Sequence, residues 1–102
     1  MTKPVAIDQN AREEIDEALA FTATLGKQTL DEFQQAIRDL WPLLEANPAL
    51  GARLPGTKAR QYPMVKYPYY VIYTEEPNRL RIYAFGHAHR KPNYWKKRLR
   101  NP

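Results

Sequence analysis

The stretch YPYYVIYTEEPNRLRIYAFGHAHRKPNYW, which runs from Tyr67 to Trp95, carries the strongest structural signal in this chain. It contains two runs of alternating side chains, at residues 69–74 and 79–86, and the EEPN between them is typical of a turn. This pattern predicts an antiparallel hairpin of two strands. In the second run we expect an apolar face that packs on helices, made of Leu80, Ile82 and Ala84. The opposite face is expected to carry arginines and aromatic rings, namely Arg79, Arg81, Tyr83 and Phe85.

The residues before this hairpin predict a short strand and two helices. KPVAI, at residues 3–7, is a candidate strand with Val5 and Ile7 as its apolar positions. Residues 10–26 and 29–44 each place apolar side chains at helical spacing. Because so few residues separate these two helices, we expect them to run antiparallel as a helix hairpin. The apolar stripe of the second helix is predicted to consist of Leu30, Phe33, Ile37, Leu40, Trp41 and Leu44.

Local signals mark the expected ends of both helices. Asn10 and Thr29 are predicted N-caps, because each is followed three positions later by a glutamate, as in a capping box. Gly26 is the expected left-handed stop of the first helix. Pro42 lacks an N–H donor, so we expect it to kink the second helix or to end its regular part.

A weaker strand is predicted at residues 61–66, where Pro63 restricts it to a sheet edge or a bulge. Together these elements predict an α+β fold in one domain that spans residues 1–102. In this fold a short N-terminal strand and an antiparallel helix hairpin pack on a small, mostly antiparallel sheet.

The composition narrows the class of protein. The chain has 102 residues and no cysteine, so it can form neither disulfides nor thiolate metal sites. Hydrophobic residues make up 43%, which argues against disorder. No apolar run approaches the roughly 18 residues of a membrane span, and the N-terminus lacks the apolar centre of a signal peptide. We therefore expect a cytoplasmic protein that does not contact the membrane.

The net charge of +5 is unevenly distributed along the chain. Residues 8–45 hold nine acidic and three basic residues, whereas residues 46–102 hold twelve basic and two acidic residues. Such an asymmetry is typical of a surface that faces a polyanion, and it also occurs where Lys and Arg only solubilise strands and a tail. From charge alone both interpretations stay open.

A cluster of polar and aromatic side chains follows the second strand of the hairpin, and it contains His87, His89, Arg90, Lys91, Tyr94 and Trp95. Two histidines without a third ligand nearby argue against a metal site. The chain has no cysteine or serine nucleophile and no glycine-rich phosphate loop, so we expect no cofactor. Metal-independent acid–base chemistry, or binding without chemistry, remains.

Cleavage of RNA through its own 2′-OH needs a base, a cation near the phosphorane and an acid. If the protein is a ribonuclease, the catalytic candidates are His87, His89, Arg90 and Tyr94. If it only binds, the candidates for target contact are Arg60, Lys66, Arg79, Arg81, Lys91 and Trp95. A third interpretation makes Arg90 and Lys91 a solvated tail and folds Tyr94 and Trp95 back over a sheet edge.

The order of strand, helix hairpin, three strands and short basic tail resembles the RelE/ParE superfamily of bacterial toxins. The resemblance rests on NPALGARL at residues 47–54, the strand YPYYVIY, and the tail segment HAHRKPNYW, and it covers nearly the whole chain. It implies the toxin of a type II toxin–antitoxin module, also described as a plasmid stabilisation system protein, that inhibits growth. The implied partner is a cognate antitoxin, which neutralises the toxin in a hetero-oligomer.

The superfamily divides into two groups. RelE-like members are ribosome-dependent mRNA endoribonucleases with paired lysines before the YPYY-like strand, an arginine within it, an arginine in the tail and a final tyrosine. Here Tyr70 and Ala88 occupy the two arginine positions, whereas Tyr94 matches the final tyrosine. ParE-like members inhibit DNA gyrase and lack that catalytic set, so the chain is closer to them. The resemblance thus implies a toxin that binds a target such as gyrase, and the alternative is a RelE-type ribonuclease acting on ribosome-bound mRNA.

Overall fold

The computed structural model describes residues 3–100, except for the side chain of residue 100. The chain forms β1 (Val5–Ile7), α1 (Gln9–Ala23), α2 (Lys27–Ala46), β2 (Ala52–Arg53), β3 (Arg60–Pro63), β4 (Tyr69–Glu76), β5 (Arg79–His87) and a 3-10 helix, η1 (Lys96–Arg100). The strands form one sheet in the order β1-β5-β4-β3-β2, in which β1 runs parallel to β5 and the other neighbours are antiparallel. The predicted α+β fold is confirmed. No helix within the described residues is long and apolar enough to cross a membrane.

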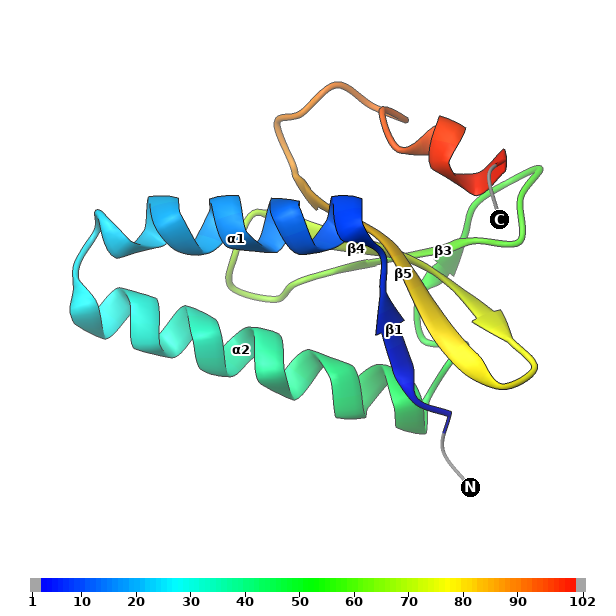
Figure 1. Cartoon of the computed structure of the whole chain (residues 1–102), viewed down its shortest axis with the longest axis horizontal. Helices are drawn as coiled ribbons and strands as arrows, with labels where there is room; N and C mark the ends of the chain where they lie inside the picture. The colour runs from blue at the N-terminus through cyan, green and yellow to red at the C-terminus, as the bar shows by residue number, and fades with distance from the viewer. Residues whose placement is uncertain (1–2, 101–102) are drawn as a thin grey trace.

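The two faces of the sheet are covered by different parts of the chain. Figure 1 shows the helix hairpin lying along the sheet and the C-terminal segment, in orange and red, returning from the end of β5 toward the loop before β3. The main hydrophobic cluster lies between the sheet and the hairpin. It includes four residues of the predicted α2 stripe, and these are Phe33, Ile37, Leu40 and Leu44. The core therefore forms where the apolar stripe of α2 packs against one face of β4 and β5.

A second, smaller cluster lies on the opposite face of the sheet. Ile72 of β4 packs there with Ala59, Ala84 and Trp95, and Leu99 of η1 packs against them. Trp95 is 3% exposed. The C-terminal segment is therefore a packed layer of the fold. One interpretation of the sequence placed Tyr94 and Trp95 over an edge of the sheet, but the segment covers part of a face.

A β-bulge in β5 separates two halves of the strand. Ile72 of β4 pairs with Ala84, but the next residue, Tyr73, pairs with Ile82, so Tyr83 has no residue opposite it. An extra residue of this kind shifts the alternation by one position, and a shift of one position exchanges the two faces of a strand.

The faces predicted for Ala84 and Phe85 were therefore wrong. Leu80 and Ile82 pack toward the helices as expected, but Phe85 joins them, whereas Ala84 lies in the cluster on the other face. His87 follows Phe85 to the helix side, where it contacts the ring of Tyr69. The basic and aromatic face expected for β5 is thus divided at the bulge.

The helix ends differ from the predicted caps. Asp8, in an extended conformation, precedes α1, so Asn10 lies inside the helix, and Thr29 likewise lies inside α2. Gly26 has φ 121°, a value that favours glycine, and stands directly before α2. Three residues thus separate the two helices, and the reversal depends on the glycine backbone rather than on a capping side chain.

Pro42 lies inside α2, which continues to Ala46. Of the two effects expected of Pro42, an end of the helix was wrong, and a kink stays a prediction. The carbonyl that loses its donor belongs to Arg38, and both residues are exposed. Water can therefore replace the missing hydrogen bond, and the buried stripe on the other side of the helix holds it together.

Tyr73 connects the sheet to the loop after α2. Its side chain is fully buried, and its hydroxyl donates to the carbonyl of Pro48 at 2.8 Å and accepts from the N–H of Gly51 at 2.9 Å. A Cβ at Gly51 would lie 2.9 Å from the Tyr73 ring, so the loop can approach only through a glycine. Burial raises the pKa of the Tyr73 phenol, which therefore keeps its proton at neutral pH and remains a donor.

We predict that Tyr73→Phe lowers the free energy of unfolding by about 1–3 kcal/mol, because it leaves the buried N–H of Gly51 without an acceptor. Urea denaturation measures the change. Tyr62→Phe is the matched control, since Tyr62 is half-buried and its hydroxyl forms no hydrogen bond among the described residues. Equal losses in the two variants would contradict this role for the hydroxyl.

Candidate functional site

The centre of the candidate site is the carboxylate of Glu14, in the second turn of α1. Its side chain is 7% exposed. Glu14 accepts hydrogen bonds from the backbone N–H of Phe85 at 3.1 Å and from the Tyr94 hydroxyl at 2.6 Å. It also accepts from the guanidinium groups of Arg90 at 2.8 Å and Arg98 at 2.7 Å. One buried carboxylate thus joins α1, β5 and the C-terminal segment.

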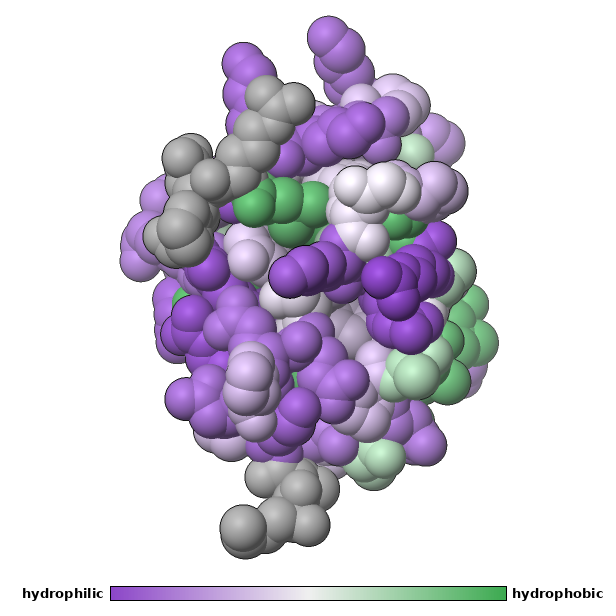
Figure 2. Space-filling model, turned by 90° about the vertical axis from the view of Figure 1, so that its right-hand side faces the viewer, coloured by the Kyte–Doolittle hydropathy of each residue, from purple (hydrophilic) through white to green (hydrophobic). Residues whose placement is uncertain are grey.

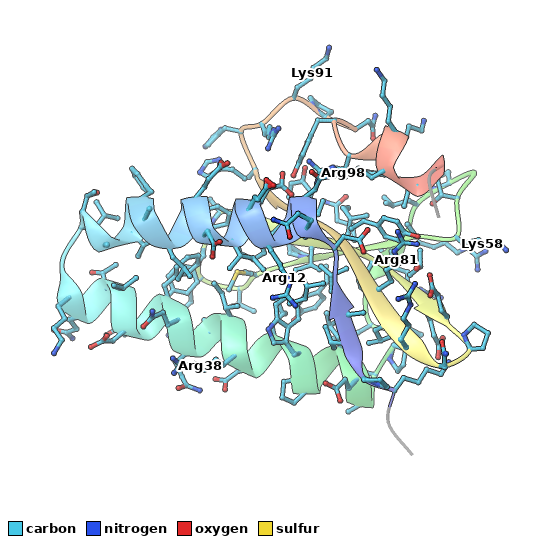
Figure 3. The ribbon with its side chains drawn as sticks, in the orientation of Figure 1. Arg12, Arg38, Lys58, Arg81, Lys91 and Arg98 are labelled. Carbon is cyan, nitrogen blue, oxygen red and sulfur yellow. The ribbon has the colours of Figure 1, made fainter. Side chains whose placement is uncertain are left out.

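The charges around Glu14 explain why a carboxylate is tolerated there. A buried charge is costly unless it is paired and hydrogen-bonded, and here two guanidinium groups face one carboxylate. Arg98 also donates to the carbonyl of Tyr83 at 3.0 Å. Figure 3 shows Arg98 lying beside the first half of α1, whereas Lys91 points away from the molecule. Arg98 is 19% exposed and Arg90 is 47% exposed, so Arg90 is the cation that solvent and partners can reach.

Tyr94 is held as a proton donor. Burial raises the pKa of its phenol above the ordinary value, and the hydrogen bond to Glu14 raises that pKa further. The guanidinium carbon of Arg90 lies 3.8 Å from the centre of the Tyr94 ring. A group acts efficiently as general acid or base when its pKa is near the working pH. The Tyr94 phenol is therefore suited to holding the tail and poorly suited to proton transfer.

Gly86 allows two tyrosine rings to meet the sheet. A Cβ at this position would lie 2.6 Å from the ring of Tyr70 and 2.8 Å from the hydroxyl of Tyr94. Any side chain at position 86 would push these rings away from the strand. The glycine is thus required for the close approach of the tail to β5.

The two histidines contact each other at the end of β5. The Nδ1 atom of His87 accepts the backbone N–H of His89 at 3.1 Å, and the two ring centres are 5.1 Å apart. His87 is half-buried with its ring nearly perpendicular to that of Tyr69, and His89 is exposed. His87, Arg90 and Glu14 line a hollow of about 240 Å³. The four candidate catalytic residues therefore form two separate pairs. His87 and His89 contact each other, whereas Arg90 and Tyr94 are both bound to Glu14.

Most of the predicted target-binding residues make contacts within the fold. Arg81 pairs with Asp8 at 3.0 Å, and Arg79 pairs with Glu76. Arg60 donates to the backbone carbonyls of Gly51 and Ala49, and Trp95 is buried in the second cluster. Lys66 and Lys91 are exposed and form no ion pair among residues 3–100. Their roles in binding stay predictions.

Sequence reasoning missed Glu14 and Arg98. Glu14 is one of four acidic residues between positions 13 and 17, yet it lies three residues after Ala11 and four before Ala18, which are both buried. A carboxylate on the apolar stripe of a helix was the available signal, because a buried acid needs a basic partner. No comparable signal marks Arg98. Within the described residues, no three His, Asp or Glu side chains come together where they could hold a metal ion.

We predict that Glu14→Gln lowers the free energy of unfolding by about 3 kcal/mol, because two guanidinium groups lose their buried counter-charge. It should also release the C-terminal segment, so limited trypsin digestion would cut faster after Lys96 or Lys97. Glu13→Gln is the matched control, since Glu13 is exposed on the same helix turn. The role assigned to Glu14 fails if both variants have the same stability and the same rate of tail cleavage.

Comparison with known proteins places the fold in a family. Residues 5–92 match the family described as "ParE toxin of type II toxin-antitoxin system, parDE". One similar solved structure is "Chromosomal ParDE TA system from P. aeruginosa", with a TM-score of 0.74 and 14% sequence identity over 86% of this chain and 98% of that chain. A search of curated proteins finds no match. Because the family match covers most of the chain, this protein belongs to the ParE toxins of type II toxin–antitoxin systems within the RelE/ParE superfamily.

Proposed function

We propose that this toxin stops bacterial growth by binding a macromolecular target in the cytoplasm, with DNA gyrase as the first candidate, and that a cognate antitoxin neutralises it. Membership of the ParE family supports the toxin role. The choice between binding and cleavage depends on the tail, because cleavage needs His87, His89, Arg90 and Tyr94 to be free for chemistry and binding does not.

The contacts of Glu14 carry the argument for binding. Its carboxylate accepts hydrogen bonds from Arg90 and Tyr94. These two side chains are the cation and the acid that RNA cleavage would need. A phosphate group approaching Arg90 would meet the negative charge of Glu14, and the raised pKa keeps the Tyr94 proton in place. Ala88 and Tyr70 stand where ribonuclease relatives carry arginines. These features support recognition rather than catalysis.

One observation favours the alternative, a ribosome-dependent mRNA endoribonuclease. His87 and His89 are adjacent, and His87 lines the hollow that Arg90 also reaches. An imidazole pair beside a cation could supply a base and an acid without a metal. The two histidines therefore distinguish the mechanisms better than Arg90 or Tyr94, which also stabilise the fold.

We predict that the chain arrests growth when expressed alone, and that His87→Ala and His89→Ala remain toxic. A ribonuclease would lose about 10²- to 10⁴-fold in mRNA cleavage with either change, the usual contribution of general acid–base catalysis. Lys91→Ala should weaken toxicity, because an exposed charge contributes to a salt-sensitive contact with the target. Growth curves and mapping of cut sites in translated mRNA give the readouts, with melting temperatures as the check on folding. Loss of both toxicity and mRNA cutting in the histidine variants would favour the ribonuclease.

A groove beside α2 is the proposed antitoxin site. It has a volume of about 540 Å³ and lies between α2 and the segment after β3, with Leu43, Met64 and Val65 among its apolar lining. Val65 is 89% exposed and Leu43 is 39% exposed. Exposed apolar side chains that gather beside a groove are typical of a protein interaction site.

The charges at the groove indicate the chemistry of its occupant. Glu32 and Asp39 of α2 lie on one side and Lys66 lies on the segment after β3, and none of the three forms an ion pair among residues 3–100. The groove therefore fits an amphipathic antitoxin segment whose apolar side chains enter it while basic side chains face α2. Such a partner would stabilise the folded toxin by mass action.

We predict that Val65→Asp weakens antitoxin binding by about tenfold or more, because it places a charge against the apolar face of the partner. Coexpressed antitoxin should then fail to restore growth. Leu25→Asp is the matched control, since Leu25 is 58% exposed at the turn between the helices and does not line the groove. Calorimetry measures both affinities. If Leu25→Asp is the more damaging variant, the antitoxin site lies elsewhere.

A further inference from the structure

A second cleft opens at the end of the sheet where β4 turns into β5, and its lining includes Tyr83, whose carbonyl accepts from Arg98 as Glu14 does. It has a volume of about 490 Å³ and lies between the loop before β3, the end of β4 with its turn, and η1. Figure 2 looks onto this end of the molecule and shows a mainly hydrophilic face interrupted by a hydrophobic area. The residues of the cleft that matter here are Lys58, Thr74, Pro77, Lys96 and Leu99. Because Thr74 is four residues beyond Tyr70 in β4, their Cα atoms are roughly 13 Å apart.

Thr74 lines this cleft, and its hydroxyl oxygen is itself buried and has no hydrogen-bond partner among the described residues. Thr74 is 9% exposed, and its Oγ1 is the one buried side-chain polar atom without a hydrogen-bond partner among the described residues. Burying a hydroxyl without a partner is unfavourable, so native proteins rarely keep one without a reason. The hydroxyl and the methyl group of threonine share one carbon, and a change of rotamer exchanges their positions. Thr74 can therefore offer its hydroxyl to a molecule bound in the cleft.

The mouth of the cleft carries uncompensated positive charge. Lys58 and Lys96 are exposed, and neither forms an ion pair among residues 3–100. Figure 3 shows Lys58 extending from its loop into solvent. The carboxylates of the cleft are already paired, since Glu75 binds Lys3 at 3.0 Å and Glu76 binds arginines of β5. The two lysines are therefore available to an anion.

We propose that this cleft binds a small phosphate monoester with an organic body, of the class of a nucleoside monophosphate. The phosphate lies between Lys58 and Lys96, because lysine ammonium groups bind phosphate as point charges. The organic body lies against Leu99 and Pro77, and the Thr74 hydroxyl hydrogen-bonds to it. The volume of the cleft is within the range of small-molecule sites. This activity is separate from the proposed toxin function and does not depend on it.

The test is an NMR titration of the whole chain at low salt with AMP, adenosine and inorganic phosphate in parallel. AMP should cause saturable shifts at residues 56–59 and 74–77 with millimolar affinity, and adenosine or phosphate alone should bind at least about tenfold more weakly. Shifts spread over all basic surfaces, or no saturable shift with AMP, would overturn the proposal. Phosphate binding as tightly as AMP would overturn the role of the organic body.

Two kinds of variant separate the site from general charge attraction. Lys58→Ala with Lys96→Ala should weaken AMP binding by more than about tenfold, whereas the charge-matched pair Lys27→Ala with Lys91→Ala should leave it unchanged. Thr74→Val should keep or raise the melting temperature, since it removes an unpartnered hydroxyl, and yet weaken AMP binding. Equal weakening in the two lysine pairs, or unchanged affinity in Thr74→Val, contradicts the site as described.

Discussion

The buried carboxylate of Glu14 is the interaction on which the C-terminal half of the structure depends. A carboxylate on the core side of a helix cannot stay unpaired, and none of the residues three or four positions away on α1 (Asn10, Ala11, Glu17 and Ala18) carries a positive charge. Its cationic partners are Arg90 and Arg98, which come from the end of the chain. The tail must therefore cross back over the sheet to reach α1, and in doing so it buries Trp95 and closes the second cluster. Removing the charge would weaken both layers at once.

The sequence predicts the elements of this fold well and their orientation less well. The α2 stripe and the alternation of β4 were readable because each has one period over its whole length. The bulge at Tyr83 was not readable, because Tyr83, Ala84 and Phe85 are each compatible with either face of a sheet. The pairing with β4 and the packing of the tail on Ala84 determine to which face of the sheet each of these side chains points. The helix caps were missed for a similar reason, since Asp8 pairs with Arg81, 73 residues away, instead of capping α1.

The candidate site shows the same division between local and long-range information. Arg90 and Tyr94 were recognised from the sequence as side chains able to do chemistry, and the structure brings them together. Their common partner was hidden among several glutamates, and only the spacing of Glu14 between Ala11 and Ala18 distinguished it. Arg60, Arg79 and Arg81 were expected on a binding surface because they are basic. Each of them instead binds a group from another part of the chain, outside its own strand. Charge alone therefore could not distinguish exposed cations from structural ones.

The structure also bears on how far family membership determines mechanism. A chain with 14% identity to this one reaches a TM-score of 0.74, so the fold survives the replacement of most side chains. Mechanism belongs to particular side chains placed on a fold and does not follow from the fold itself. In this chain the tail residues most capable of chemistry are bonded to an internal carboxylate, and cations such as Lys91 remain exposed. A surface arranged in this way can recognise an anionic or acidic partner with cations such as Lys91, while the two arginines bound to Glu14 keep the tail in place.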